Sequence, residues 1–133
     1  MMRPQEACVA HILIVDDDPN LVDTLRVLFE SADHRVSAVD RGEETFAVIE
    51  SDHPDLVILD MFLPEMHGLD VYSQLRELPR AGEMAVLVLT GAVEYEASLE
   101  EIGVRYLFKP VRHAELTAVV NELLAALPKG VSS

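Results

Sequence analysis

The stretch at residues 55–60 constrains the fold most strongly, because four consecutive apolar residues stand directly before Asp60. Two of them, Val57 and Ile58, are β-branched, and an uninterrupted apolar run of this length is typical of a strand buried on both faces in a parallel sheet. In open sheets of this class the carboxyl ends of the strands face the ligand crevice. We therefore expect Asp60 to face a site, although an acid here could by itself merely cap the next turn.

Composition limits the chain to a few classes of protein. With 133 residues, of which 50% are hydrophobic, we expect one domain with its core at about residues 11–127 and flexible ends at residues 1–10 and 128–133. No apolar run approaches the roughly 18 residues of a membrane span, so we expect a cytoplasmic protein without membrane contact. Cys8 is the only cysteine, which excludes an internal disulfide.

Four more apolar runs have the length of strands, at residues 11–15, 35–39, 84–89 and 104–108. Apolar residues at helical spacing predict a helix after each strand, and the fourth of these, at residues 94–102, has the poorest apolar stripe. The third helix is expected to end before Pro79. Five strands that alternate with five helices predict an α/β fold with a parallel, doubly wound sheet in the order 2-1-3-4-5.

Two of these helices have recognisable start signals. Asp18 can cap the first helix, whose first position is Pro19, a favoured arrangement at a helix start. Asp40, with Glu43 three residues later, resembles a capping box and predicts the start of the second helix.

Polar side chains follow the strands at the same edge of this sheet. The strand order places the first and third strands side by side, so that Asp16 and Asp17 meet Asp60 in one crevice. Thr90 and Lys109 follow the fourth and fifth strands. Taken singly, each of these residues could be a helix cap, a strand end or a loop residue. Their joint placement at one edge favours a site.

The charge of this crevice predicts its chemistry. The net charge of −14, without a lysine or arginine cluster, argues against direct nucleic-acid binding, and part of it could serve a cation. Three crowded carboxylates repel one another, and Mg²⁺ accepts such oxygen ligands while keeping several waters. Asp60 is then placed as a nucleophile that forms an acyl phosphate. Lys109 and Thr90 can neutralise and hydrogen-bond phosphate oxygens.

These segments together resemble the receiver domain of two-component response regulators, over about residues 11–127. The matching segments are residues 12–17, residues 59–64 with Gly68, residues 89–91 and residues 108–110. The resemblance implies a flavodoxin-like fold and a place in a phosphorelay. Asp60 would accept a phosphoryl group from a histidine kinase or phosphotransfer protein, and the domain would then change its affinity for a downstream protein or output domain, which the sequence does not identify.

The resemblance also implies the members of a metal site. Asp16, Asp17, Asp60 and the backbone carbonyl of Phe62 would hold Mg²⁺. The chain would not be an enzyme in the usual sense, because receivers catalyse only their own phosphorylation and dephosphorylation.

On the phosphate side, the resemblance implies that Thr90 and Lys109 bind phosphate oxygens as the catalytic partners of Asp60. Thr90 and Tyr106 would form the switch, with Tyr106 changing its exposure on activation. The peptide bond between Lys109 and Pro110 would be cis.

The sequence departs from the family at two places. His67 stands where the family commonly has an acid, a position outside the phosphate crevice, and we expect it to matter little. Thr90 and Lys109 are 19 residues apart, fewer than is usual, which predicts a shortened fourth helix. Family members meet partners or dimerise through this helix, the fifth strand and the fifth helix, so a homodimer stays open as an alternative.

Two other functions compete with this interpretation. A magnesium-dependent phosphatase of the haloacid dehalogenase kind would use an Asp-x-Asp pair, and Asp16 and Asp18 fit that spacing. However, Pro19 follows at once and the chain has no room for a cap domain. A receiver-like scaffold that no longer responds to phosphate is the second alternative, and the intact set of crevice residues argues against it.

The lifetime of the phosphoryl group can also be predicted. Hydrolysis needs a water in line with phosphorus, and a polar side chain can orient it. The residues best placed to do so, by resemblance, lie two after Asp60 and two after Thr90, and these are Phe62 and Ala92. Because neither side chain can hydrogen-bond a water, we expect slow self-dephosphorylation.

Overall fold

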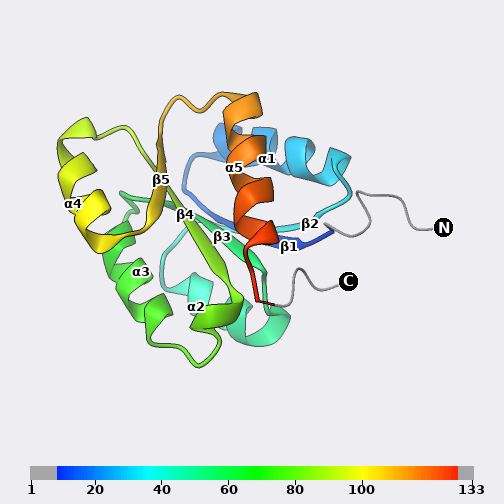
Figure 1. Ribbon diagram of the computed structural model, residues 1–133, viewed down its shortest axis with the longest axis horizontal. Helices are drawn as coiled ribbons and strands as arrows, with labels where there is room; N and C mark the ends of the chain where they lie inside the picture. Colours follow the sequence, from blue (N-terminus) through cyan, green and yellow to red (C-terminus); the bar gives the residue numbers. More distant parts are fainter. Residues whose placement is uncertain (1–8, 129–133) are drawn as a thin grey trace.

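A five-stranded parallel sheet lies between two layers of helices in the computed structural model (Figure 1). The structure describes residues 9–128, and the expectations for residues 1–8 and 129–133 lie outside that range. The elements in chain order are β1 (His11–Val15), α1 (Pro19–Ser31), β2 (Arg35–Val39), α2 (Glu44–Asp52), β3 (Leu56–Asp60), α3 (Gly68–Arg76), η2 (Ala81–Glu83), β4 (Ala85–Thr90), η3 (Val93–Tyr95), α4 (Glu96–Ile102), β5 (Arg105–Phe108) and α5 (His113–Ala125).

The strand order is β2-β1-β3-β4-β5, which confirms the predicted topology. Helices α1 and α5 cover one face of the sheet, and α2, α3 and α4 cover the other (Figure 1). Right-handed crossovers in this strand order place helices on both faces of the sheet. Because all five strands are parallel, the connections that leave their carboxyl ends lie at one edge of the sheet.

Strand β3 occupies the centre of the sheet, and its four apolar residues are buried, as predicted, together with Asp60. Val57 and Leu59 pack into the core under α2, α3 and α4, whereas Leu56 and Ile58 pack into the core under α1 and α5. Burying an aliphatic side chain of this size contributes roughly 1.5–3 kcal/mol. The strand that ends at Asp60 is thus held from both faces.

Helix α1 begins as the sequence predicts. The carboxylate of Asp18 accepts hydrogen bonds from the backbone amides of Asn20 and Leu21, at 3.0 and 3.5 Å, and Pro19 is the first helical residue. This cap fixes the path of the chain immediately after Asp16 and Asp17.

The predicted capping box at the second helix is wrong. Helix α2 begins at Glu44, and no side chain caps its first turn. The carboxylate of Glu43 forms an exposed ion pair with Arg41, with 3.5 Å between the nearest nitrogen and oxygen. The first amides of the helix bond to the carbonyls of a backbone turn, because Glu44 donates to Arg41 and Thr45 donates to Gly42.

Helix α4 has seven residues, fewer than any of the other four α-helices, in agreement with the predicted shortening. The segment predicted as one helix at residues 94–102 is divided between the 3-10 turn η3 and α4. Other boundaries differ slightly, since α3 ends at Arg76 and β5 begins at Arg105. Among residues 9–128, no helix has the length and apolar character that crossing a membrane requires.

Candidate functional site

Three carboxylates meet at the carboxyl edge of the sheet. Asp60 is the last residue of β3, and Asp16 follows β1, where its backbone amide donates to the carbonyl of Val39 at 3.1 Å. One carboxylate oxygen from each of Asp16, Asp17 and Asp60 lies within 4.8 Å of the others. Asp16 and Asp60 are buried and Asp17 is exposed, so the cluster opens to solvent on one side.

Lys109 places an ammonium group against two of these carboxylates. Its Nζ lies 3.0 Å from Oδ2 of Asp16 and 3.1 Å from Oδ1 of Asp60. The backbone amide of Lys109 donates to the carbonyl of Thr90 at 2.8 Å, which continues the pairing of β4 with β5. The peptide bond to Pro110 is cis, as the resemblance implies.

The electrostatics of the cluster follow from burial and crowding. Burial raises the pKa of Asp60, the nearby charge of Asp16 raises it further, and Lys109 and the backbone amide of Phe62 only partly oppose this. Burial lowers the pKa of Lys109, but hydrogen bonds and charge from Asp16 and Asp60 outweigh burial, and the net shift is upward. The cluster therefore favours additional positive charge.

The donor set fits magnesium. Mg²⁺ binds oxygen at about 2.1 Å, so two oxygens on opposite sides of one ion lie about 4.2 Å apart. Three carboxylate oxygens, one each from Asp16, Asp17 and Asp60, lie within 4.8 Å of one another, close to this distance. A hollow of about 460 Å³ between α1 and the end of β2 is lined in part by Asp16 and Asp17.

The backbone around Asp60 depends on Gly68. A Cβ atom at residue 68 would lie 2.3 Å from the carbonyl oxygen of Asp60 and 2.7 Å from Cα of Met61. The amide of Gly68 donates to the carbonyl of Met61 at 2.6 Å. The loop after β3 can close against the end of its own strand because residue 68 has no side chain.

Thr90 ends β4, between the ends of β3 and β5. Its side chain is buried, and its Oγ1 accepts a hydrogen bond from the amide of Ala92 at 3.0 Å. A hydroxyl that accepts in this way keeps its own hydrogen for a second partner. Thr90 can thus donate to a group bound at this edge.

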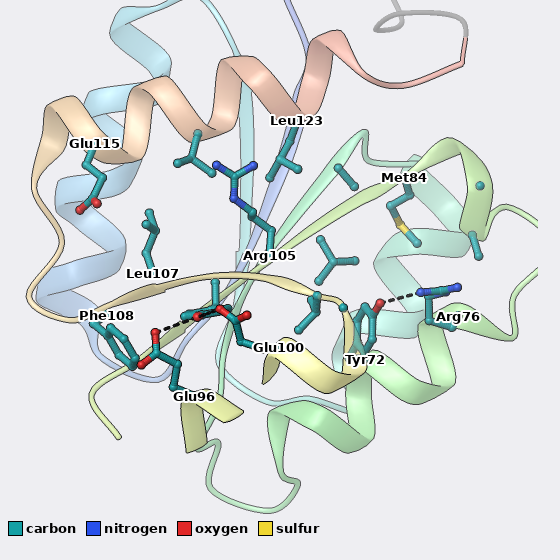
Figure 2. Close-up of a pocket in the computed structure, with 18 of the residues that line it drawn as sticks. Tyr72, Arg76, Met84, Glu96, Glu100, Arg105, Leu107, Phe108, Glu115 and Leu123 are labelled. Carbon is teal, nitrogen blue, oxygen red and sulfur yellow. Dashed lines mark hydrogen bonds between the residues drawn. The ribbon is translucent and has the colours of Figure 1, made fainter. Parts of the chain in front are cut away.

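Tyr106 stands apart from the carboxylate cluster. Its hydroxyl contacts the carboxylates of Glu100 and Glu96 on α4, at 2.5 and 2.8 Å, and the hydrogen bond to Glu100 is the main cause of its raised pKa. Figure 2 shows both glutamates at a groove of about 1580 Å³ that follows β5. This groove is separate from the carboxylate cluster, because its lining does not include Asp16, Asp60, Thr90 or Lys109.

The phosphatase alternative needs Asp18 as a general acid beside Asp16. Asp18 is instead exposed, and its carboxylate is engaged by the amides at the start of α1. This observation favours a structural role for Asp18.

Comparison with known proteins identifies the family. A family model described as the response regulator receiver domain matches residues 12–121. The chain belongs to this family. This receiver is 33% identical over 120 residues to an uncharacterized 14.6 kDa protein of Leptolyngbya boryana, covering 88% of this chain and 92% of the relative. It is 32% identical over 113 residues to the DNA-binding response regulator MtrA of Mycolicibacterium smegmatis, covering 85% of this chain but only 50% of that longer protein.

Solved structures agree with this assignment. A receiver domain protein from Methanospirillum hungatei is 29% identical, with a TM-score of 0.81, and covers 91% of this chain and 98% of its own. The response regulator TrrA of Thermotoga maritima, solved in complex with Mg²⁺ and BeF, is 30% identical, with a TM-score of 0.77, and covers 86% of this chain and 98% of its own.

The receiver also contains a contact among aromatic side chains that the sequence did not predict. The ring of Phe62 lies 5.1 Å from the ring of His67 and 5.6 Å from the ring of Tyr95, between centroids. His67 Nδ1 also accepts from the amide of Leu69 at 3.1 Å and so caps α3. A histidine directly before a helix-starting glycine could have suggested the cap, but no local signal brings Tyr95 to Phe62.

Proposed function

We propose that this receiver takes a phosphoryl group from a histidine kinase or phosphotransfer protein onto Asp60, and that phosphorylation changes its affinity for a downstream protein partner. In this proposal residues 1–133 act as one receiver domain. The observation that carries it is the placement of Asp60, a buried carboxylate at the carboxyl end of the central strand, against Lys109 and two further acids.

The transfer is a displacement at phosphorus. A carboxylate oxygen of Asp60 bonds to phosphorus while the bond to the donor's imidazole nitrogen breaks, and the imidazole takes up a proton from solvent. Lys109, which already contacts Asp60 at 3.1 Å, would neutralise one phosphate oxygen. Thr90 would donate its free hydroxyl hydrogen to another. Both groups act where charge develops, which is the main protein contribution to phosphoryl transfer.

Magnesium would be held by Asp16, Asp17, Asp60 and the backbone carbonyl of Phe62. The ion supplies positive charge that three crowded carboxylates and an incoming phosphoryl group otherwise lack. The 4.8 Å limit on the separations of the carboxylate oxygens supports this set. So does the similarity to TrrA, whose structure contains Mg²⁺ with BeF.

The proposed switch consists of Thr90 and Tyr106. Thr90 would move its hydroxyl toward the phosphoryl group, and Tyr106 would then change its exposure at the surface of β5. The contacts of the Tyr106 hydroxyl with Glu96 and Glu100 fix its starting position against α4. A change at Thr90 could therefore reach the groove along β5.

The test is phosphorylation with a small phosphodonor such as acetyl phosphate, followed by intact-mass measurement. Wild-type protein with Mg²⁺ should gain one phosphoryl group, and removal of Mg²⁺ by a chelator should prevent the gain. Asp60→Asn should gain none, because an amide does not form the acyl phosphate. Equal modification of wild type and Asp60→Asn would remove Asp60 from its role.

A further inference from the structure

Three rings meet from the segments that follow β3 and β4, the two strands that end at Asp60 and Thr90. Phe62 lies in the loop after β3, His67 caps α3 at the end of that loop, and Tyr95 belongs to η3, in the segment after β4. The centroid distances are 5.1 Å for Phe62 and His67, 5.6 Å for Phe62 and Tyr95, and 6.0 Å for His67 and Tyr95. We call these three residues the ring cluster.

The ring cluster has the geometry of attractive aromatic contacts. Phe62 meets His67 at 79° and Tyr95 at 69°, both edge to face. Aromatic pairs in this arrangement contribute about 0.5–1.5 kcal/mol beyond the area that they bury. Phe62 is nevertheless 46% exposed, so contacts with two rings, and not burial in the core, hold its side chain in place.

Backbone contacts connect the ring cluster to both sides of the crevice. Phe62 and His67 form an isolated antiparallel bridge, which closes the loop that begins at Asp60. On the other side, the amide of Tyr95 donates to the carbonyl of Ala92 at 3.1 Å, and the amide of Ala92 donates to Thr90 Oγ1 at 3.0 Å. The rings thus join the loop that follows the proposed acceptor, Asp60, to the segment that follows its proposed hydroxyl partner, Thr90.

We propose that His67 and Tyr95 are positioning residues that hold the ring of Phe62 beside Asp60, and that the intact ring cluster keeps hydrolytic water out of the crevice after phosphorylation. This inference rests on the proposed function. In addition to that function, His67 and Tyr95 would act through Phe62 to lengthen the lifetime of the phosphoryl group.

The step under control is hydrolysis of the acyl phosphate. A water oxygen bonds to phosphorus, the bond from phosphorus to the carboxylate oxygen of Asp60 breaks, and the electron pair leaves with that carboxylate. The proton of the water passes to the phosphate product or to solvent. The water must approach in line with the breaking bond, so a fixed apolar ring beside the crevice slows the step. Neither Phe62 nor Ala92 offers a polar side chain that would orient this water.

Two variants each remove one of the two rings that contact Phe62. Tyr95→Ala removes one ring from the segment after β4. His67→Asn removes the other ring but keeps an oxygen that can cap α3, because asparagine is among the preferred N-cap residues. Both proteins are loaded with acetyl phosphate and Mg²⁺, separated from the donor, and followed by intact mass, with their thermal unfolding recorded in parallel.

Two matched controls separate the rings from other effects. Tyr95→Phe keeps the ring and removes the hydroxyl. Val93→Ala changes an exposed residue of the same 3-10 turn that is outside the ring cluster. Tyr95→Ala and His67→Asn should lose the phosphoryl group roughly three to ten times faster than wild type, a modest effect on the scale of positioning in catalysis. Tyr95→Phe and Val93→Ala should decay at the wild-type rate.

The outcomes are distinct. Unchanged decay in both ring-removal variants overturns the inference while leaving Asp60 as the acceptor, because loading is measured before decay. Decay of Tyr95→Phe as fast as that of Tyr95→Ala would assign the effect to the hydroxyl and overturn the role of the ring. Equally fast decay of Val93→Ala would show general loosening of the loop, which would also overturn the role of the rings. Wild type that does not load overturns the proposed function and this inference together.

Discussion

The two edges of the sheet both bury polar groups, but they satisfy them in different ways. At the amino edge, where the strands begin, the buried polar residues are His11, His34 and Asp55. At the carboxyl edge, where the strands end, they are Asp16, Asp60 and Thr90. Burial alone therefore does not separate a site from a structural network.

At the amino edge Asp55 and His34 accept from backbone amides, and the ring of His11 bonds through Nε2 to the hydroxyl of Ser37 at 2.7 Å. Asp55 Oδ2 accepts from the amide of His11 at 2.9 Å, and His34 Nδ1 accepts from the amide of Ala10 at 3.0 Å. The carbonyl of Ala10 accepts from the amide of Arg35 at 2.9 Å, so this network extends the pairing of β1 and β2 by one residue. The partners of Asp55 and His34 are neutral backbone groups, although Nδ1 of His11, also buried at this edge, has no hydrogen-bond partner among residues 9–128.

At the carboxyl edge Asp16 and Thr90 also accept from backbone amides, but the two buried acids have charged side chains among their partners as well. Asp16 and Asp60 share the ammonium group of Lys109, and Asp17 lies within reach of both acids. Burial raises the pKa of Asp60, and the nearby charge of Asp16 raises it further, so Lys109 does not fully compensate the crowded acids. The comparison indicates that a buried acid marks a site when it shares charged side chains with other acids, whereas Asp55, whose bond is to a backbone amide, has a structural role.

The largest expected effect comes from Gly68 at the carboxyl edge. Gly68→Ala places a Cβ atom 2.3 Å from the carbonyl oxygen of Asp60, and the backbone must shift to relieve the clash. We expect the free energy of unfolding to fall by about 3 kcal/mol, in the upper range for overpacking. Loading of the acceptor should slow as well, because the end of β3 moves. Chemical denaturation and intact mass measure the two effects.

Gly82→Ala is the matched control for this substitution, since a Cβ atom at residue 82 meets nothing within 4 Å. It should change the free energy of unfolding by less than about 0.5 kcal/mol. If Gly68→Ala behaves like this control, the loop after β3 does not depend on the close approach described here.

The next largest effect is expected when one acid of the cluster is neutralised. Mg²⁺ at 100 times its dissociation constant should stabilise wild-type protein by about 2.7 kcal/mol through binding to the folded state. Asp17→Asn should lose at least half of this gain. The metal-free variant should be more stable than metal-free wild type, because one repelling charge is gone. Thermal unfolding with and without Mg²⁺ measures both quantities.

Asp52→Asn changes an exposed acid at the end of α2 and serves as the control. Its stabilisation by Mg²⁺ should equal that of wild type. A metal-free Asp17→Asn protein that is less stable than wild type would contradict the account of crowded carboxylates.

A smaller effect is expected at the amino edge as pH falls. Burial lowers the pKa of His34 from its ordinary value of 6.5, against the opposing charges of Asp33 and Asp55. Below about pH 6.5 the unfolded chain takes up a proton that the folded protein disfavours, so stability from this group is present above that pH and is lost as pH falls. Protonation at Nδ1 would also remove the acceptor for the amide of Ala10.

His34→Asn keeps an acceptor near the position of Nδ1 but cannot titrate. The advantage of wild type over this variant should be roughly 1 kcal/mol near pH 7.5, because the variant loses the ring that packs edge to face against Phe29. It should shrink toward pH 5. Denaturation of both proteins across this range tests the prediction, and an advantage that stays constant or grows in acid would show that His34 is not held neutral.

The sequence predicts this fold well where the signals are local. An apolar run that stops at a polar residue marks both the strand and its end, so Asp60, Thr90 and Lys109 could be placed at one edge before any geometry was known. The cap at Asp18 could be predicted in the same way. The capping box at Asp40 was wrong because the chain first makes a backbone turn, and the helix begins only at Glu44, after the predicted partner Glu43.

The remaining parts depend on how separate loops approach one another. His67 reads as an ordinary residue before a glycine, and Tyr95 belongs to a segment with a weak apolar stripe. Their contacts with Phe62 arise when the segments after β3 and β4 fold at the same edge. Periodicity and spacing do not report such contacts. The contact of the Tyr106 hydroxyl with Glu96 and Glu100 on α4 likewise depends on how two segments pack, and periodicity does not predict it.

The most direct test of the account compares one buried acid from each edge. Wild type, Asp60→Asn and Asp55→Asn are treated with acetyl phosphate and Mg²⁺ and then mapped at the level of peptides. Asparagine at residue 55 keeps an oxygen that can accept from the amide of His11, so Asp55→Asn should fold and load as wild type does. The account predicts one phosphoryl group on the peptide that contains Asp60 in these two proteins and none in Asp60→Asn. A phosphoryl group on the Asp55 side chain, or equal loading of Asp60→Asn, would contradict the assignment of the two edges.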